Sequence, residues 1–238
     1  EALFSKQSTY IGEELKHHYF YQFKRLDRVV VLCNFDANRY RNYDKNINPC
    51  VIYNPLTVSP GALSKGTSKK FLAVGRFSHL HKGFDILINA FNIFTKNNKE
   101  WTLDIVGEGP EETMYRELIS KYSLENRITI HPFTSDIQSH YSEAQIYVLS
   151  SRWEGFGLVL VEAMAHGLPV VSSDLPTSHE IMGDFGMYFK NGDAEALAMK
   201  LHEATTIDWK EKSEKAIEIS RCFDVETITA QWVSIIES

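Results

Sequence analysis

The sequence predicts an α/β fold, a doubly wound parallel sheet, on two observations. From residue 70 onward, short apolar segments of strand length alternate with longer stretches in which apolar residues recur at helical spacing. Turn-forming residues separate the two kinds of segment. Parallel strands are joined by right-handed crossovers, so helices cover both faces of such a sheet. Ligands bind to these domains beyond the carboxyl ends of the strands.

Six strands are expected in this repeat, at residues 71–74, 101–106, 127–130, 146–149, 169–172 and, as the weakest candidate, 186–189. A helix that begins near Gly83 has one apolar face at helical spacing, formed by Phe84, Leu87, Ile88, Phe91 and Phe94. Further helices are expected from Pro110, a residue favoured in a first turn, at about 136–142, and from Leu158 to a stop at Gly167.

The first 56 residues do not follow this repeat. A strand at 28–32, a short helix at 36–43 and a strand at 51–53 bury too little surface to fold alone. We therefore expect residues 1–56 to be the remnant of another domain and the turn-rich residues 57–69 to be a linker. The doubly wound domain then spans residues 70–221. Residues 222–238 form a helix with an apolar stripe that packs toward the first domain.

The composition is typical of a soluble globular protein, with 238 residues of which 43% are hydrophobic and 24% charged. No apolar run has the length of a membrane span and no secretion-signal pattern is present, so a cytoplasmic location is expected. The net charge of −6 argues against a general nucleic-acid binder. Three scattered cysteines, Cys33, Cys50 and Cys222, predict reduced thiols rather than a disulfide framework.

The charge is unevenly distributed along the chain. Residues 1–56 carry eight Lys and Arg against six Asp and Glu, whereas the remainder carries 17 against 25. The excess of basic residues in 1–56 has two interpretations, attraction to an anionic membrane surface or a solvated helix face. The second is the simpler. The chain begins at Glu1 rather than Met, which fits a piece of a longer protein.

The segment from Glu154 to Glu162 carries the strongest functional signal. It follows the expected strand at 146–149 and places a Gly-Phe-Gly loop before an apolar helix. Free backbone N–H groups and the positive end of that helix favour a phosphate there. Glu162 lies about one turn into the helix, where its carboxylate can accept hydrogen bonds from a sugar diol. The alternative is a helix-dipole partner and an exposed carboxylate.

Two cations follow the first strand of the repeat. Arg76 and Lys82 lie in the loop from Gly75 to Gly83, at the strand's carboxyl end. Together they can stabilise the charge that develops on a leaving diphosphate without a metal. The alternative is that Arg76 pairs with a carboxylate and Lys82 is solvated. After the next strand, Gly107-Glu-Gly109 permits close approach of a ligand, or marks only a tight turn.

Four histidines are weaker candidates. His79 and His81 are of a residue type that often binds metals, but no third ligand has suitable spacing. We therefore interpret both as loop residues. His131 and His166 are expected to be packed or partly exposed rather than to act as bases.

Five motifs occur in the order of a known family. They are Gly75-Arg76, Lys82-Gly83-Phe-Asp, Gly107-x-Gly109-Pro110, Glu154-Gly-Phe-Gly-Leu158 and Glu162-Ala-Met-Ala-x-Gly-Leu-Pro169-Val-Val. Together they resemble the C-terminal half of a retaining glycosyltransferase of family four, which has the two-domain GT-B fold with Rossmann-like halves. The resemblance covers about residues 26–238. It includes Asp27-Arg-Val-Val-Val and Val51-Ile-Tyr-Asn-Pro55, which are similar to the end of the family's N-terminal domain.

The resemblance implies a role for each candidate residue. Arg76 and Lys82 hold the donor diphosphate, and Glu162 binds the ribose hydroxyls. Glu154 contacts the transferred sugar, and the loop at 131–133 borders the base. The implied donor site consists of Gly75, Arg76, Lys82, Gly107, His131, Pro132, Phe133, Glu154, Gly155, Phe156, Gly157, Leu158 and Glu162, with Glu154, Arg76 and Lys82 as catalytic residues.

The resemblance also implies a reaction and its partners. The donor is a nucleotide diphosphate sugar, by family tendency a UDP-sugar, and the acceptor is a glycan or lipid-linked sugar in polysaccharide synthesis. No metal and no cofactor are needed. The sugar keeps its anomeric configuration by front-face attack, with Glu154 steadying positive charge. The complete enzyme is expected at the inner face of the cell membrane, held there through its other half.

Two departures from the family and several rivals limit this interpretation. The family's N-terminal domain, with the acceptor site, is almost wholly absent, so this chain alone is expected to bind donor without transferring sugar. Thr177-Ser-His179-Glu180 stands where many relatives carry a glycine pair, which puts the detail of the sugar pocket in doubt.

The rival class is a non-catalytic nucleotide-binding or scaffold module. A GT-B epimerase or a sugar-phosphate synthase stays open, whereas the missing G-x-G-x-x-G argues against an NAD dehydrogenase.

Overall fold

A computed structural model describes residues 13–58, 61–78 and 80–237 of the chain. Internal contacts divide the chain into a larger unit, Leu56–Asp224, and a smaller unit made of Glu1–Pro55 and Val225–Ser238. The expected donor-site residues all belong to the larger unit.

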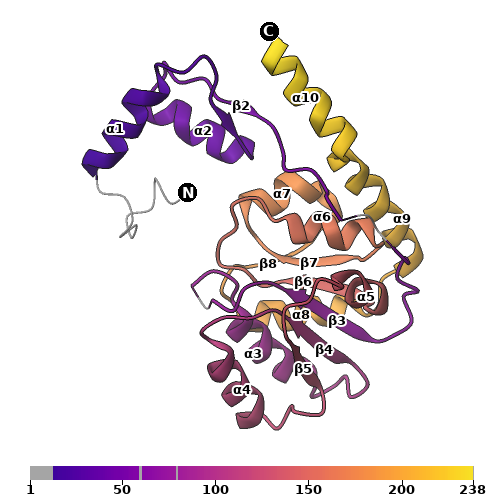
Figure 1. Cartoon of the computed structure of the whole chain (residues 1–238). Coiled ribbons are helices and arrows are strands. Elements are labelled where there is room, and N and C mark those ends of the chain that lie inside the picture. Colours follow the sequence, from indigo (N-terminus) through magenta and orange to yellow (C-terminus); the bar gives the residue numbers. More distant parts are fainter. Residues whose placement is uncertain (1–12, 59–60, 79, 238) are drawn as a thin grey trace. The chain divides into compact units, whose positions relative to one another are not determined.

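The larger unit is built on a sheet of six parallel strands (Figure 1). Their order across the sheet is β5-β4-β3-β6-β7-β8, and every neighbouring pair is parallel. The strands are β3 Lys70–Val74, β4 Thr102–Val106, β5 Ile128–His131, β6 Ile146–Leu149, β7 Val170–Ser173 and β8 Met187–Phe189. The predicted doubly wound parallel fold is therefore confirmed, including the weakest strand.

Helices follow the strands of this sheet, as the alternating pattern predicted. They are α3 Phe84–Phe94, α4 Glu112–Lys121, α5 Ile137–Glu143, α6 Leu158–Ala165, α7 Pro176–Met182, α8 Ala194–Ala204 and α9 Trp209–Ser220, with short 3₁₀ turns η1 Gly183–Phe185 and η2 Arg221–Phe223. Helices α7, α8 and α9 were not predicted. An aspartate caps each of the last two: Asp193 accepts from the Ala196 N–H and Asp208 from the Glu211 N–H.

The predicted boundaries of two helices have different outcomes. Helix α6 stops as expected, because Gly167 follows it in the left-handed conformation with φ 77°. Helix α4 does not open at Pro110 but begins two residues later, at Glu112. The preceding loop is held to the β3–α3 loop by the hydrogen bond from Phe77 N to Glu108 O (2.7 Å), so the chain completes a turn before the helix starts.

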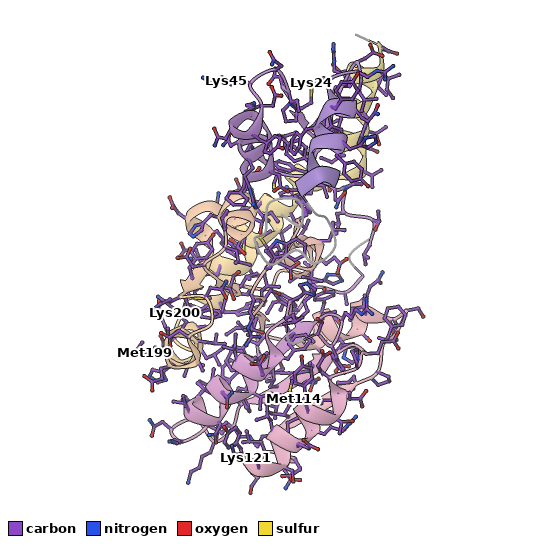
Figure 2. All side chains as sticks on the ribbon, turned by 90° about the vertical axis from the view of Figure 1, so that its left-hand side faces the viewer. Lys24, Lys45, Met114, Lys121, Met199 and Lys200 are labelled. Atoms are coloured by element: carbon purple, nitrogen blue, oxygen red, sulfur yellow. The ribbon has the colours of Figure 1, made fainter. Side chains whose placement is uncertain are left out.

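Two helical layers enclose the sheet. Alternate residues of the strands, such as Phe71, Leu103 and Val148, pack with α3, α4 and α8 into one hydrophobic core. Tyr147 of β6 points to the opposite face, where its ring meets Tyr141 of α5, and α6 and α9 pack together. Met199 lies on the outer side of α8 and is exposed, and Lys200 follows it (Figure 2). Burial on both faces explains why most residues of the strands are apolar.

The smaller unit contains α1 Glu13–Phe23, β1 Val30–Val31, α2 Asn34–Tyr43, β2 Cys50–Val51 and α10 Val225–Glu237. Strands β1 and β2 form a parallel pair. Phe20 of α1 stacks on Tyr43 of α2, with ring centroids 3.8 Å apart. On α10, Ile228 is buried, whereas Trp232 and Ile236 are exposed. None of the helices in the described parts of the chain combines the length and the apolar character that a membrane crossing requires.

Residues 57–69 belong to the larger unit, which begins at Leu56. Leu56 N donates to the Phe223 carbonyl (2.7 Å), and Ser64 N donates to the His166 carbonyl (3.0 Å). The Ser64 hydroxyl also donates to the Ala144 carbonyl (2.5 Å). These contacts hold the turn-rich segment, in its described residues, against the doubly wound domain.

Candidate functional site

The order of the strands creates one switch point in the sheet. From β3 the chain proceeds outward to β4 and β5, then returns to place β6 on the other side of β3. The loops that leave β3 and β6 therefore diverge in opposite directions from adjacent strand ends, which is where open α/β sheets bind their ligands. These two loops carry Arg76 and Lys82 on one side and Glu154 on the other.

A glycine lets the two loops touch. Gly83 caps the start of α3 with φ 62°, a left-handed conformation that favours glycine. A Cβ atom at this position would lie 2.2 Å from the Ser150 carbonyl oxygen at the end of β6. Only a residue without a side chain allows this approach, and the approach brings the neighbouring Lys82 within reach of Glu154.

Lys82 and Glu154 form an ion pair across the switch point. The Lys82 Nζ atom lies 2.6 Å from Glu154 Oε1, and the two side chains are only 19% and 10% exposed. The Ser151 hydroxyl donates to the same carboxylate oxygen (2.6 Å). The pair is thus held in place without a ligand, and little water screens it.

A cavity of about 880 Å³ opens at the carboxyl ends of β3, β4 and β5. Its volume is in the range of small-molecule and cofactor sites. It is lined by Val74, Gly75, Arg76, Val106, Gly107, Glu108, Gly109, Phe133, Thr134, Ser135, Ile137 and Glu162. The cavity therefore combines backbone-exposing glycines, one cation, two carboxylates and an exposed aromatic ring.

Arg76 and Gly107 form the part of the wall beside β3 and β4. Arg76 is exposed, and no hydrogen bond or ion pair engages its guanidinium within the described part of the chain. A Cβ atom on Gly107 would lie 2.0 Å from the Gly75 carbonyl oxygen, so the two glycine loops pack backbone to backbone. This leaves a cation with free donors beside bare main chain, a combination that suits an anionic ligand.

Glu162 enters the cavity from α6 and is held from behind. The hydroxyl of Tyr141 on α5 donates to Glu162 Oε2 (2.8 Å). Tyr141 is fully buried, and burial raises the pKa of its phenol well above the ordinary value, so it stays a neutral donor. One carboxylate oxygen of Glu162 is therefore occupied by the protein.

The expected site residues fall into two groups. Gly75, Arg76, Gly107, Phe133 and Glu162 line the cavity. The others do not line it: Lys82, His131, Pro132, Glu154, Gly155, Phe156, Gly157 and Leu158. Lys82 lies next to the lining, since a Cβ on Gly75 would be 2.9 Å from Lys82 Cε. Of the four charged residues expected to bind the donor, Arg76 and Glu162 line the cavity. Lys82 and Glu154 form an ion pair next to it.

His131 turns away from the cavity toward a buried charge. It ends β5, and its Nε2 atom lies 3.4 Å from Asp104 Oδ2, while its ring meets that of His140 at 4.7 Å. Burial and the neighbouring His131 lower the pKa of His140. Histidine and aspartate can hold a metal, and one ligand atom from each of these three residues lies within 4.8 Å of the others. However, Lys70 Nζ lies 3.0 Å from Asp104 Oδ2, so the residues fit an ion pair better than a divalent cation.

The other histidines are not ligand-like in the described structure. His79 lies outside the described residues. His81 is exposed and its Nδ1 atom is 3.2 Å from the Ser78 hydroxyl. His166 is completely buried, as expected for a packed histidine.

Several lining residues were not predicted. Thr134 and Ser135 lie in the loop after β5, two residues beyond the end of the strand, and polar residues in a loop after a parallel strand were a usable signal. Glu108 lies between the two glycines of the loop after β4, and only these glycines were expected to approach a ligand. Tyr141 gave no signal, because it is one of 11 tyrosines and lies mid-helix, 21 residues from its partner Glu162.

These features define a class of protein before any comparison. A doubly wound parallel sheet whose cavity lies beside the switch point belongs to the α/β proteins that bind ligands at the carboxyl ends of their strands. The family model described as "Glycosyl transferases group 1" matches residues 59–222, more than half of the chain. The chain therefore belongs to the group 1 glycosyltransferase family.

Curated relatives share the same region. An uncharacterized glycosyltransferase of Haemophilus influenzae is 36% identical over 148 residues, which cover 61% of this chain and 41% of the relative. The amylovoran biosynthesis glycosyltransferase AmsD of Erwinia amylovora is 28% identical over 221 residues, which cover 88% of this chain and 62% of AmsD. This chain thus spans only part of the length of these relatives.

Solved structures share the fold. A variant of S. aureus TarM, in complex with fondaparinux, alpha-GlcNAc-glycerol and UDP, superposes with a TM-score of 0.84 at 22% identity, over 95% of this chain and 47% of TarM. Anabaena HepE, in complex with UDP and glucose, has a TM-score of 0.83 at 22% identity, over 95% of this chain and 68% of HepE. At this identity the likeness shows the fold, that of GT-B glycosyltransferases.

Proposed function

We propose that this chain is the donor-binding half of a retaining glycosyltransferase. It moves a hexose-type sugar from a nucleotide diphosphate sugar, a UDP-sugar, to a glycan or lipid-linked acceptor in polysaccharide biosynthesis. The observation that carries the proposal is the cavity beside the switch point, which Arg76 and Glu162 both line and whose wall lies next to the Lys82–Glu154 pair. The two cations are then available to the diphosphate of one donor, Glu162 to its ribose diol and Glu154 to its transferred sugar.

Each group has a function that its chemistry supports. The free guanidinium of Arg76 and the ammonium of Lys82 bind the diphosphate, and they stabilise the charge that it gains on leaving. The carboxylate of Glu162 accepts hydrogen bonds from the ribose hydroxyls. Phe133, whose ring is 70% exposed at the cavity, stacks against the base. The N-terminus of α6 directs its free N–H groups toward the donor.

The transfer proceeds at the anomeric carbon with retention. The acceptor oxygen forms its bond to that carbon on the face from which the diphosphate departs. The breaking C–O bond leaves its electron pair on the phosphate oxygen, which takes the acceptor proton. Glu154 stabilises positive charge on the sugar ring. No resident metal is expected, because the negative charge of the leaving group is assigned to two side-chain cations, Arg76 and Lys82.

The donor and the pathway are supported by what relatives bind and do. TarM and HepE are described in complex with UDP, and AmsD acts in amylovoran biosynthesis. Because this chain covers less than two thirds of the length of these curated relatives, the acceptor site is assigned to the part of the protein outside this chain. That part also carries any association with the inner face of the cell membrane.

The test is a donor screen with the complete enzyme. Hydrolysis or transfer is measured across a panel of nucleotide sugars, with and without EDTA, and we expect activity with a UDP-sugar that EDTA leaves unchanged. Binding of UDP to this chain alone is measured in parallel. Binding with no turnover on any donor or acceptor would favour the rival scaffold function. The absence of nucleotide binding would overturn the proposal.

A further inference from the structure

The carboxylate of Glu162 is held in one orientation before any ligand arrives. The Tyr141 hydroxyl donates to Oε2 at 2.8 Å, and no other described residue makes a hydrogen bond to this carboxylate. A free glutamate side chain has two equivalent oxygens and rotates about its last torsion. The hydrogen bond removes this equivalence, because it occupies Oε2 and leaves Oε1 for a ligand.

Tyr141 is itself fixed by its surroundings. It is fully buried on α5, four residues after Ile137, which lines the cavity. Its ring stacks on that of His166, with centroids 4.9 Å apart and an interplanar angle of 23°. Because burial keeps the phenol neutral, its O–H can only be satisfied by an acceptor, and Glu162 supplies it.

His166 connects this arrangement to the helix that carries Glu162. Its Nδ1 atom lies 2.8 Å from the backbone carbonyl oxygen of Glu162. A carbonyl oxygen only accepts, so Nδ1 carries the proton and donates. The ring is thereby tied to the last turn of α6, and its stacking sets the plane of the Tyr141 ring. Backbone and carboxylate of Glu162 are therefore held by two aromatic residues in contact with each other.

We propose that Tyr141 is a positioning residue for the donor: it orients Glu162 so that Oε1 faces the two vicinal hydroxyls of a ribose. The inference rests on the proposed function, since it assumes that Glu162 binds the diol. Tyr141 does not touch the ligand. It acts by removing the orientational freedom that Glu162 would otherwise lose on binding.

The experiment compares two ligands and three forms of the chain. UDP and 2′,3′-dideoxy-UDP, which lacks both ribose hydroxyls, are titrated calorimetrically into wild type, Tyr141→Phe and Tyr115→Phe. Tyr115 is the matched control, because it is equally buried, on α4, and its hydroxyl has no hydrogen-bond partner among the described residues. Thermal melting checks that each variant folds.

We expect Tyr141→Phe to weaken UDP binding by up to about tenfold, the order of the cost of immobilising one side chain, and to leave dideoxy-UDP binding unchanged. Tyr115→Phe should change neither. Equal weakening of both ligands by Tyr141→Phe would make the residue merely structural, and no weakening of UDP would also overturn the inference. If the wild type binds UDP but does not prefer it to the dideoxy analogue, the role of Glu162 fails. If the wild type binds neither ligand, the proposed function itself fails.

Discussion

Lys82 and Glu154 lie 72 residues apart in the chain, yet the Lys82 ammonium is 2.6 Å from the Glu154 carboxylate. Each comes from the loop after a different central strand, β3 or β6, and the two strands are neighbours only because the sheet reverses its winding between them. The ion pair therefore lies at the switch point of the sheet. It also makes the stability of the domain depend on two residues of the proposed active site.

The pair should show strong coupling in stability. Lys82→Met and Glu154→Gln each leave the partner charge largely buried, so each should lower the free energy of unfolding by about 3–5 kcal/mol. The double variant Lys82→Met/Glu154→Gln should recover most of this loss of stability. Because it lacks both charged groups, the complete enzyme that carries it should not transfer sugar. Urea denaturation measures the stabilities.

The exposed pair Lys215–Glu218 is the control for this cycle. Its side chains are 53% and 66% exposed, so we expect a coupling of about 0–1 kcal/mol. Strictly additive losses at Lys82 and Glu154 would contradict the buried pairing.

Glu162→Ala should abolish detectable UDP binding to this chain. The change removes the only carboxylate that enters the cavity from α6 and leaves the Tyr141 hydroxyl buried without an acceptor. Calorimetry provides the affinity, with Glu112→Ala, an exposed carboxylate on α4, as control. Unchanged affinity in Glu162→Ala would remove the ribose assignment.

Arg76→Ala in the complete enzyme should lower kcat more than it weakens donor binding. The guanidinium has no protein partner in the described structure, so it is free to respond to charge that grows on the leaving diphosphate. The loss in kcat should be on the order of 10²–10³-fold, as for other donors aimed at developing charge. Steady-state kinetics and UDP titration separate the two effects.

The matched variant for Arg76 is Arg116→Ala, which removes a surface guanidinium already paired with Glu112. It should leave both parameters unchanged. A fall in affinity as large as the fall in kcat would show that Arg76 binds the ground state as strongly as the transition state.

Gly83→Ala should destabilise the larger unit by about 2–4 kcal/mol, because the new Cβ combines left-handed strain with a clash at 2.2 Å from the Ser150 carbonyl oxygen. Gly192→Ala is the control, since its φ is also positive, 83°, but nothing lies within 4 Å of the added atom. It should cost only about 1 kcal/mol. Equal losses in thermal or urea unfolding would mean that the close approach of the two loops does not matter.

Local sequence information sufficed for the six strands of the larger unit and for its helices α3, α5 and α6. Apolar runs of four to six residues mark strands because both faces of a parallel sheet are buried, and Gly167 marks a helix end because it adopts a left-handed conformation. Helix α4 shows the limit of this reasoning. Pro110 is compatible with a first turn, but the tertiary hydrogen bond from Phe77 to Glu108 delays the helix to Glu112.

The candidate site divides in the same way. Its cavity-lining members were predicted where glycines and charges follow a strand directly, as at Gly75, Arg76 and Gly107. The family resemblance implied that the loop at 131–133 borders the base, but the His131 ring lies against Asp104 and His140 of α5 and does not line the cavity. Thr134 and Ser135, slightly further along the loop, take part in the cavity instead.

By itself, the sequence determined the alternation of strands and helices, the glycine loops and the pair of glutamates in α6 and its preceding loop, because periodicity and turn chemistry are properties of neighbouring residues. Only the tertiary structure decided that Lys82 pairs with Glu154, that Glu162 is held by Tyr141 and His166, and that Lys70 neutralises Asp104. These contacts depend on which strands are adjacent and how closely their loops approach. Those properties come from the packing of the whole sheet.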